Sequence, residues 1–354
     1  MVDNGPLSIG RDGDRKGSCM IAKEAGLTSE QSNRSCWVVS DGAAGNERQA
    51  LALATALGLS PRIIRLRLSH PWDWFAPRLD LGAMHAMRAE DGQVIAAPWP
   101  DIAIGCGRKA ALLTRCLRAC SEGRSFTVQI LDPRVSPDLF DVVVAPHHDQ
   151  LAGSNVLGTI GGLHAIDDAR LAEGRARFTQ LGDLPAPRTG VLIGATHPAQ
   201  ALDEEYFAAL LRMLGRRHVE EGGSFLVSTS RRTPVDLAQR LRRDFSAWPG
   251  LVWTGAEQGE NPYMGILGWA DRFVVTADSV NMVSEACATG KPVHVFAPRR
   301  IPGKLGAFHD ALMRAGHLSS IDFEPGTAAA PLRELDELAR RVQVFWQSHR
   351  LRTG

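Results

Sequence analysis

Residues 272–296 read RFVVTADSVNMVSEACATGKPVHVF, and this stretch decides the fold. An apolar run from Arg272 to Thr276 predicts a strand, the pattern from Val280 to Thr289 predicts a helix, and Pro292 to Phe296 predicts a second strand. A strand, a helix and a strand in quick succession form the unit from which parallel sheets are built. The stretch therefore predicts an α/β domain.

The same alternation runs on both sides of a proline-rich interruption. The segment from Leu184 to Arg188 holds two prolines close together, which a helix or a central strand does not accommodate, so we predict a domain linker there. We expect an α/β chain of two Rossmann-like, doubly wound domains facing a cleft. The predicted parts are a poorly ordered tail (1–34), an N-terminal domain (35–186), a C-terminal domain (187–330) and a C-terminal helix (331–354), which packs on its own domain or back on the first.

Composition limits the classes of function. A length of 354 residues fits two domains, and 40 Lys and Arg against 39 Asp and Glu leave a net charge of +1. This balance does not favour a nucleic-acid partner. The six cysteines form no C-x-x-C pair, and the chain shows neither a leader nor an apolar run of transmembrane length. We expect a cytoplasmic protein, either free or in peripheral contact with the inner membrane.

Ligands of open parallel sheets bind at the carboxyl ends of the strands. After the strand ending at Thr276, Asp278 or Ser279 can cap a helix that carries Asn281 and Glu285 on one face, with Met282 in the same turn. The helix N-terminus suits a diphosphate, and the carboxylate can accept from ribose hydroxyls. The alternative is a capped, half-exposed helix with a solvated glutamate.

Further polar residues follow the other strands of the second half. Hydroxyls and guanidinium groups in the stretch STSRRTP (228–234) favour a phosphate clamp, although a helix cap with an exposed arginine pair would look the same. The predicted nucleotide-binding residues outside the 278–285 helix are Thr196, Ser228, Ser230, Arg231, Arg232, Thr233, Asn261 and Tyr263. No cofactor is expected to bind tightly.

The strand ends of the first half predict the opposite wall of the cleft. The turn that follows Ser40 is not G-x-G-x-x-G, which disfavours a dinucleotide fingerprint, but its glycines allow a ligand to approach the backbone. The residues predicted for the acceptor side or the cleft are Gly42, Gly45, Gln49, Gly107, Arg108, Lys109, Asp132 and Arg134.

Four residues are candidate catalytic bases: Asp41, Glu47, His148 and Asp149. An imidazole oriented by a carboxylate titrates near neutrality, which favours the His148 and Asp149 pair, although His148 could also be a structural histidine that bonds a loop carbonyl. His147 and His148 lack a partner histidine or cysteine at ligand spacing, so no metal is predicted. Trp72, Trp74 and Phe75 indicate either core or a contact with a lipid-linked acceptor, a partner protein or a membrane interface.

Taken in order, these segments resemble the mitochondrial fission family named for elongated mitochondria, which has many bacterial members. The resemblance covers nearly everything after the tail. It is carried by Asp41-Gly42 with Gly45, Glu47 and Gln49, Pro100-Asp101, Gly107-Arg108-Lys109, Asp132-Pro133-Arg134, Pro146 with His148-Asp149, Asn155-Val156-Leu157, Ser230 to Pro234, Asn261-Pro262-Tyr263, Val275 to Ser279, Glu285-Ala286 and Gly290 to Val293.

The resemblance implies a fold similar to the B-type (GT-B) glycosyltransferases, with a nucleotide diphosphate sugar, UDP type favoured, in the second domain and the acceptor in the first. We expect metal-independent transfer of the sugar to an envelope or lipid-linked acceptor, with Arg231, Arg232 and Lys291 stabilising the leaving group. The plant member is described as an adaptor that recruits a dynamin-like protein. A non-catalytic adaptor is therefore one alternative function. A sugar-nucleotide epimerase of related architecture is another.

Overall fold

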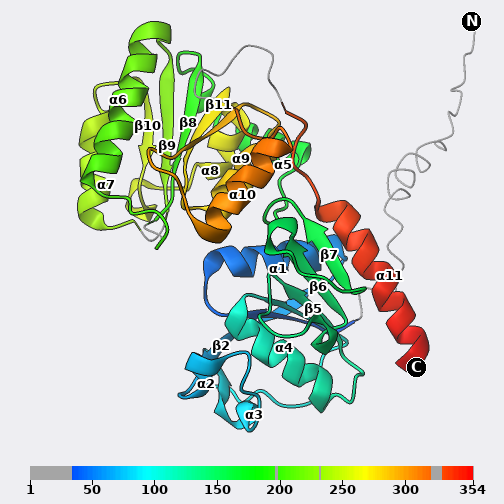
Figure 1. The fold of residues 1–354 in the computed structure, drawn as a ribbon. Coiled ribbons are helices and arrows are strands. Elements are labelled where there is room, and N and C mark those ends of the chain that lie inside the picture. Colours follow the sequence, from blue (N-terminus) through cyan, green and yellow to red (C-terminus); the bar gives the residue numbers. More distant parts are fainter. Residues whose placement is uncertain (1–33, 196–197, 231–232, 320–328, 354) are drawn as a thin grey trace, which may run out of the picture.

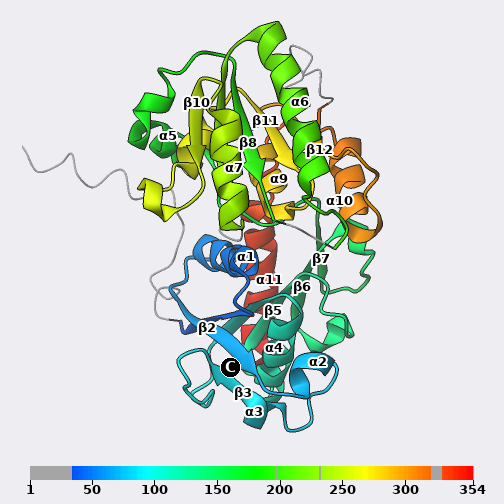
Figure 2. The same ribbon diagram turned by 90° about the vertical axis from the view of Figure 1, so that its left-hand side faces the viewer.

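The computed structural model describes residues 34–195, 198–230, 233–319 and 329–353. All of the predicted tail except Arg34 lies outside these residues, as do Thr196, Arg231 and Arg232. Two α/β domains stack one above the other, and the C-terminal helix runs down beside the first (Figure 1). The view turned by 90° shows each sheet with helices on its two faces (Figure 2). This arrangement confirms the predicted fold class.

Within the described residues, the first domain holds a seven-stranded sheet of order β3-β2-β1-β4-β5-β6-β7, parallel except for β2 with β3. Apolar clusters cover both faces of its central strands, which explains why those strands are apolar without alternation. Its elements are β1 (Cys36–Ser40), α1 (Ala44–Ala56), β2 (Pro61–Leu68), α2 (Trp72–Phe75), α3 (Ala83–Ala86), β3 (Met87–Ala89), β4 (Ile102–Cys106), α4 (Arg108–Cys120), β5 (Phe126–Ile130), η1 (Pro137–Leu139), β6 (Val142–Pro146), η2 (His147–Asp149) and β7 (Val156–Thr159).

The second domain, as far as the structure describes it, has a parallel five-stranded sheet of order β10-β9-β8-β11-β12. The predicted unit at 272–296 forms β11, α9 and β12, because Val283 and Cys287 turn one face of α9 into the core. The elements are β8 (Arg188–Ile193), α6 (Glu204–Glu221), β9 (Ser224–Thr229), α7 (Val235–Phe245), β10 (Gly250–Trp253), η4 (Ala256–Gln258), α8 (Tyr263–Trp269), β11 (Arg272–Thr276), α9 (Val280–Cys287), β12 (Val293–Phe296) and α10 (Gly303–Arg314).

The chain crosses between the domains earlier than the predicted linker. Helix α5 (Asp168–Arg177) and η3 (Thr179–Leu181) lie before that linker, yet Leu171 and Phe178 belong to the core of the second domain. The boundary predicted at 186/187 is therefore wrong, and the crossing follows β7, near residues 160–166. The two prolines that suggested a linker instead lead into β8, where the carbonyl of Pro185 accepts a hydrogen bond from Ser224.

Helix α11 (Leu335–Thr353) belongs to the first domain by packing, although it ends the chain. Leu338, Val342 and Trp346 lie in the same apolar cluster as strands β1, β4 and β5. At the crossing itself, the Glu334 carboxylate accepts from the backbone N–H groups of Ile160 and Gly161. Glu334, just before α11, therefore holds together the two segments of the chain that pass between the domains, one after β7 and one before α11. No helix among the described residues is long and apolar enough to cross a membrane.

Candidate functional site in the interdomain cleft

Helices α1 and α9 face each other across the domain boundary. The amide Nε2 of Gln49 donates to Oδ1 of Asn281 at 3.2 Å, and Oε1 of Gln49 accepts from the Leu163 N–H at 3.2 Å. Gly45 lies so close to Asn281 that a Cβ there would overlap with its amide, which explains the glycine. Part of the polar face of α9 thus packs against the first domain.

Glu285 lies one helical turn further along α9 and is also held by the first domain. The residue is 7% exposed, Oε2 accepts from the Tyr263 hydroxyl at 2.5 Å, and Nη1 of Arg48 lies 3.6 Å from Oε1. Burial raises the pKa of Glu285, while Arg48 and the Tyr263 hydrogen bond oppose that rise. In this arrangement of the domains, the carboxylate predicted to bind ribose is already bonded to Tyr263 and paired with Arg48.

A cavity of about 460 Å³ opens at the N-terminus of α9, between the domains. Ser279 caps the helix by accepting from the Met282 N–H, while the other N–H groups of a first helical turn have no acceptor within the helix. The cavity brings together four predicted residues with one that was not predicted: Asp278, Ser279, Asn281, His148 and Lys304. It has the donors and the dipole to hold an anion.

Asp278 fixes the loop that begins this cavity. Its carboxylate accepts from the Thr276 hydroxyl and from the Ala195 N–H, each at 2.6 Å. A Cβ on Gly194 would overlap with the same carboxylate. Asp278 therefore connects the ends of β8 and β11, and its side chain is 8% exposed.

Lys304, near the start of α10, joins the second domain to the first. Its Nζ lies 2.9 Å from Asp132 and 2.7 Å from Asp149, which follow β5 and β6. Burial tends to raise the pKa of Asp132, but Lys304 and the N–H of Arg134 lower it overall. The two acids raise the pKa of Lys304 against the effect of its burial. The ammonium group thus stays charged at the rim of the cavity.

His148 differs from the other three candidate bases. Its Nδ1 is buried and has no hydrogen-bond partner among the described residues, and its ring lies 5.9 Å from that of Phe308. Burial lowers the pKa of His148, with Lys304 and His147 adding to this effect and Asp149 opposing it. A neutral imidazole at neutral pH can accept a proton.

Two of the other candidate bases, Asp41 and Glu47, and several predicted cleft residues are engaged within the first domain, whereas Asp149 pairs with Lys304 of the second. Asp41 accepts from Asn46 beside Gly107 and from the Ala43 N–H, and Glu47 forms a two-bonded ion pair with Arg65 at 2.8 and 2.9 Å. Arg108 and Lys109 bind the segment that contains α2, through its carbonyls and Asp73 respectively. Gly42 and Arg134 both adopt positive φ in the loops after β1 and β5.

The predicted phosphate loop after β9 is only partly described. Ser228 is buried, the N–H of Ser230 donates to the Ile193 carbonyl, and the Thr233 hydroxyl donates to Gly194. Thr233 lines a separate cavity of about 280 Å³ between α6 and α7. Asn261 accepts from the Tyr263 N–H and fixes that turn.

The leaving-group role predicted for Lys291 is wrong. Helix α9 carries the chain back to the amino edge of the sheet, and there the Lys291 ammonium donates to the carbonyls of Gly268 and Ala270. Burial lowers the pKa of Lys291 to about 8. Among the residues described, no group of three or more His, Cys, Asp and Glu side chains could hold a metal ion.

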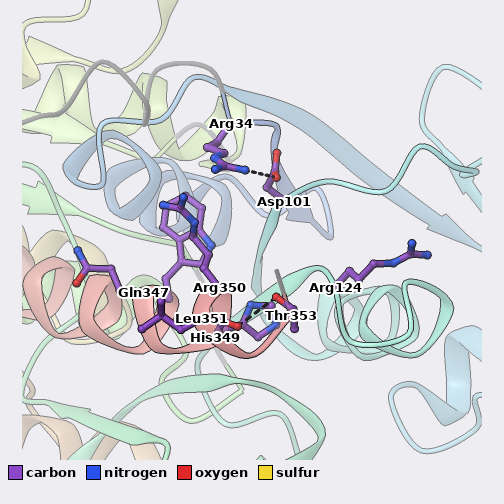
Figure 3. A pocket seen from close by; sticks show the side chains of 9 residues that line it. Arg34, Asp101, Arg124, Gln347, His349, Arg350, Leu351 and Thr353 are labelled. Carbon is purple, nitrogen blue, oxygen red and sulfur yellow. Dashed lines mark hydrogen bonds and ion pairs between the residues drawn. The ribbon is translucent and has the colours of Figure 1, made fainter.

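A cavity of about 540 Å³ in the first domain lies at the C-terminal end of α11 (Figure 3). Arg34, paired there with Asp101 at 3.3 Å, and Arg350 contribute to its wall. It faces the amino ends of β1 and β4, where Cys36 and Ile102 begin those strands. Ligands of parallel sheets bind at the opposite ends, so the interdomain cavity is the better candidate.

Comparison with known proteins identifies the family of this chain. A family model described as Mitochondrial fission ELM1 matches residues 44–346. The chain belongs to that family. The mitochondrial fission protein ELM1 of Arabidopsis thaliana is 27% identical, over 86% of this chain and 90% of that protein. Uncharacterized protein RP120 of Rickettsia prowazekii (strain Madrid E) is 24% identical, over 74% of this chain and 83% of that protein.

A solved structure shares the fold of this ELM1 family member. It is that of a protein assigned as a UDP-N-acetylglucosamine 2-epimerase from Listeria monocytogenes, with a TM-score of 0.52 and 12% identity, covering 91% of this chain and 97% of that one. The two-domain, GT-B-like architecture is thereby established for the chain.

Two residues that shape the cleft of this ELM1 family member were not predicted from the sequence: Arg48 and Lys304. No local pattern marks a cation whose partners lie in the other domain.

Proposed function

We propose that this chain binds a nucleotide diphosphate sugar in the interdomain cavity and transfers the sugar to an envelope or lipid-linked acceptor. One observation carries the proposal: the capped N-terminus of α9 opens into a cavity that is also lined by Lys304 and by His148, whose buried Nδ1 has no hydrogen-bond partner among the described residues. A diphosphate matches the helix N-terminus and the cation. The shared fold of a protein named for a UDP-sugar epimerase supports the nucleotide class.

His148 is the base that the cavity favours. In the transfer, an acceptor oxygen forms the new bond to the anomeric carbon, the bond from that carbon to the diphosphate breaks, and the diphosphate leaves with the electron pair. The acceptor proton passes to the neutral imidazole of His148. The α9 N-terminus and Lys304 would stabilise the charge on the departing diphosphate.

Thermal-shift measurements across nucleotides test the binding step. Ligands that bind the folded chain raise its apparent stability by mass action, so UDP and UDP sugars should raise the melting temperature more than GDP and adenosine diphosphate do. Equal shifts for all four kinds of ligand, or none, would refute selective binding. Products formed from the UDP sugar alone would indicate epimerisation, whereas release of UDP that depends on an added acceptor would indicate transfer.

A non-catalytic adaptor is the second candidate, and the state of Glu285 favours it. Tyr263 and Arg48 already occupy this carboxylate, and the residue lines none of the cavities described above. The Arabidopsis relative is named a mitochondrial fission protein, which is a role outside sugar transfer. An adaptor would show no nucleotide-dependent stabilisation, and Glu285→Gln would leave its partner binding unchanged.

A further inference from the structure

Three large apolar side chains are exposed on the segment between β2 and β3. Trp74 is 69% exposed, Phe75 57% and Leu81 83%. In the part of the chain that the structure describes, Trp74 and Phe75 are the only tryptophan or phenylalanine side chains that are more than half exposed. We call these three residues the distal patch, because both views place α2 and α3 at the end of the first domain farthest from the second (Figures 1 and 2).

The backbone of this segment is held firmly while its apolar side chains point outward. Arg108 donates to the carbonyls of Ala76 at 2.6 Å and Asp73 at 3.3 Å. The indole Nε1 of Trp72 donates to the carbonyl of Leu81 at 3.0 Å and ties the two ends of the segment together. Hydrogen bonds to the backbone therefore hold this segment on the first domain, and the three side chains of the distal patch do not pack into its core.

The charge around the distal patch is positive. Lys109 pairs with Asp73 and Arg115 pairs with Asp80, so both acids of the segment are neutralised. The segment between β2 and β3 contains Arg78 and is bonded by Arg108, Lys109 and Arg115 of α4. Four positive charges less the two acids leave a local charge of +2, whereas the whole chain carries +1. Exposed aromatic rings within a cationic surround match the interface of an anionic bilayer.

We propose that the distal patch docks on the surface of an anionic lipid bilayer. Trp74, Phe75 and Leu81 enter the boundary between head groups and acyl chains, and Arg78 and Arg88 face the anionic head groups. This attachment is independent of the nucleotide site, because the docking end of the first domain lies away from the interdomain cavity (Figure 1).

Sedimentation of the full chain with vesicles tests this docking. The chain should bind vesicles of phosphatidylcholine mixed with phosphatidylglycerol, bind phosphatidylcholine vesicles more weakly, and lose binding as salt increases. The triple variant Trp74→Ser, Phe75→Ser and Leu81→Ser should bind the anionic vesicles at least about tenfold more weakly, because each side chain loses its transfer from water. Arg78→Glu should weaken binding roughly fivefold or more.

A matched control replaces equally exposed apolar residues of the second domain. Val219, Val235 and Met313 are 87%, 73% and 63% exposed, and the variant with all three changed to serine should bind like wild type. Unchanged circular dichroism and melting temperature would show that the triple distal variant is folded. No binding of wild type to anionic vesicles, or equal losses for both triple variants, would overturn the proposal. So would a distal variant that changes only self-association, since this would make the patch a protein contact.

Discussion

Arg48 of the first domain approaches Glu285 of the second, with 3.6 Å between Nη1 and Oε1. The acid that would hold a ribose thus also holds the two domains together. A nucleotide that reaches Glu285 must replace Arg48, whose side chain is 54% exposed and free to withdraw into solvent. We therefore expect the domains to move apart at this point when the cleft is occupied.

Glu285 should make stability depend on pH. Its folded pKa is raised above the ordinary value of 4.5, so the folded state binds more protons than the unfolded chain between the two pKa values. The free energy of unfolding should therefore fall as pH rises from about 4.5 through the folded pKa. Urea titrations of wild type and Glu285→Gln over this range measure the effect. An identical decline in both proteins would contradict the assignment to Glu285.

The contact of Gly45 with Asn281 should show in a double-mutant cycle. Gly45→Ala pushes the Asn281 amide from its place and breaks its bond with Gln49, which should cost about 1 kcal/mol of unfolding free energy. In the background of Asn281→Ala the same glycine change should cost less, because the overlap is gone. Additive losses would show that the two residues do not touch.

Lys304 should matter for ligands more than for stability. Its side chain is 58% exposed, so Lys304→Ala should change the unfolding free energy by less than about 1 kcal/mol. The same change removes the cation at the rim of the cavity and should weaken UDP binding about tenfold. Arg314→Ala, an exposed position at the other end of α10, is the control and should leave UDP binding unchanged. Equal affinities in the two variants would exclude Lys304 from the site.

Lys291 predicts a second pH effect, of opposite sign to that of Glu285. Its folded pKa of about 8 lies below the ordinary value of 10.5, so between these values the unfolded chain binds more protons. The free energy of unfolding contributed by this residue should rise as pH increases through that window. The measurement is the difference between wild type and Lys291→Met at pH 7 and pH 10. A difference that is constant with pH would contradict the lowered pKa.

The sequence predicted the elements well where burial imposes a period. Strand β11 and helix α9 appeared at their observed positions because Val275, Val283 and Cys287 all face the same core. The domain crossing was missed because Gly161 and Gly162 carry no apolar pattern, whereas Pro185 and Pro187 mimic a linker. The role of those glycines depends on Ser284 and Glu334, which approach their backbone from distant parts of the chain.

Four of the residues that line the interdomain cavity were among those predicted from the sequence, but their connections were not. Asp278, Ser279, Asn281 and His148 meet at one cavity because strand ends converge at the edge of a parallel sheet. The ion pairs of Arg48 and Lys304 depend on how two domains are placed, and no local spacing encodes that placement. Lys291 was misplaced because the length of α9 decides which edge of the sheet it reaches.

The most direct test of nucleotide binding at the α9 N-terminus is a calorimetric titration of UDP into wild type and Asn281→Asp. Aspartate has the shape of asparagine and is favoured in a first helical turn, so the variant should fold, but its charge repels a diphosphate. We predict that wild type binds UDP and that Asn281→Asp binds it at least about tenfold more weakly, a loss of about 1.4 kcal/mol. Equal affinities, or no heat of binding with wild type, would contradict a nucleotide site in this cleft.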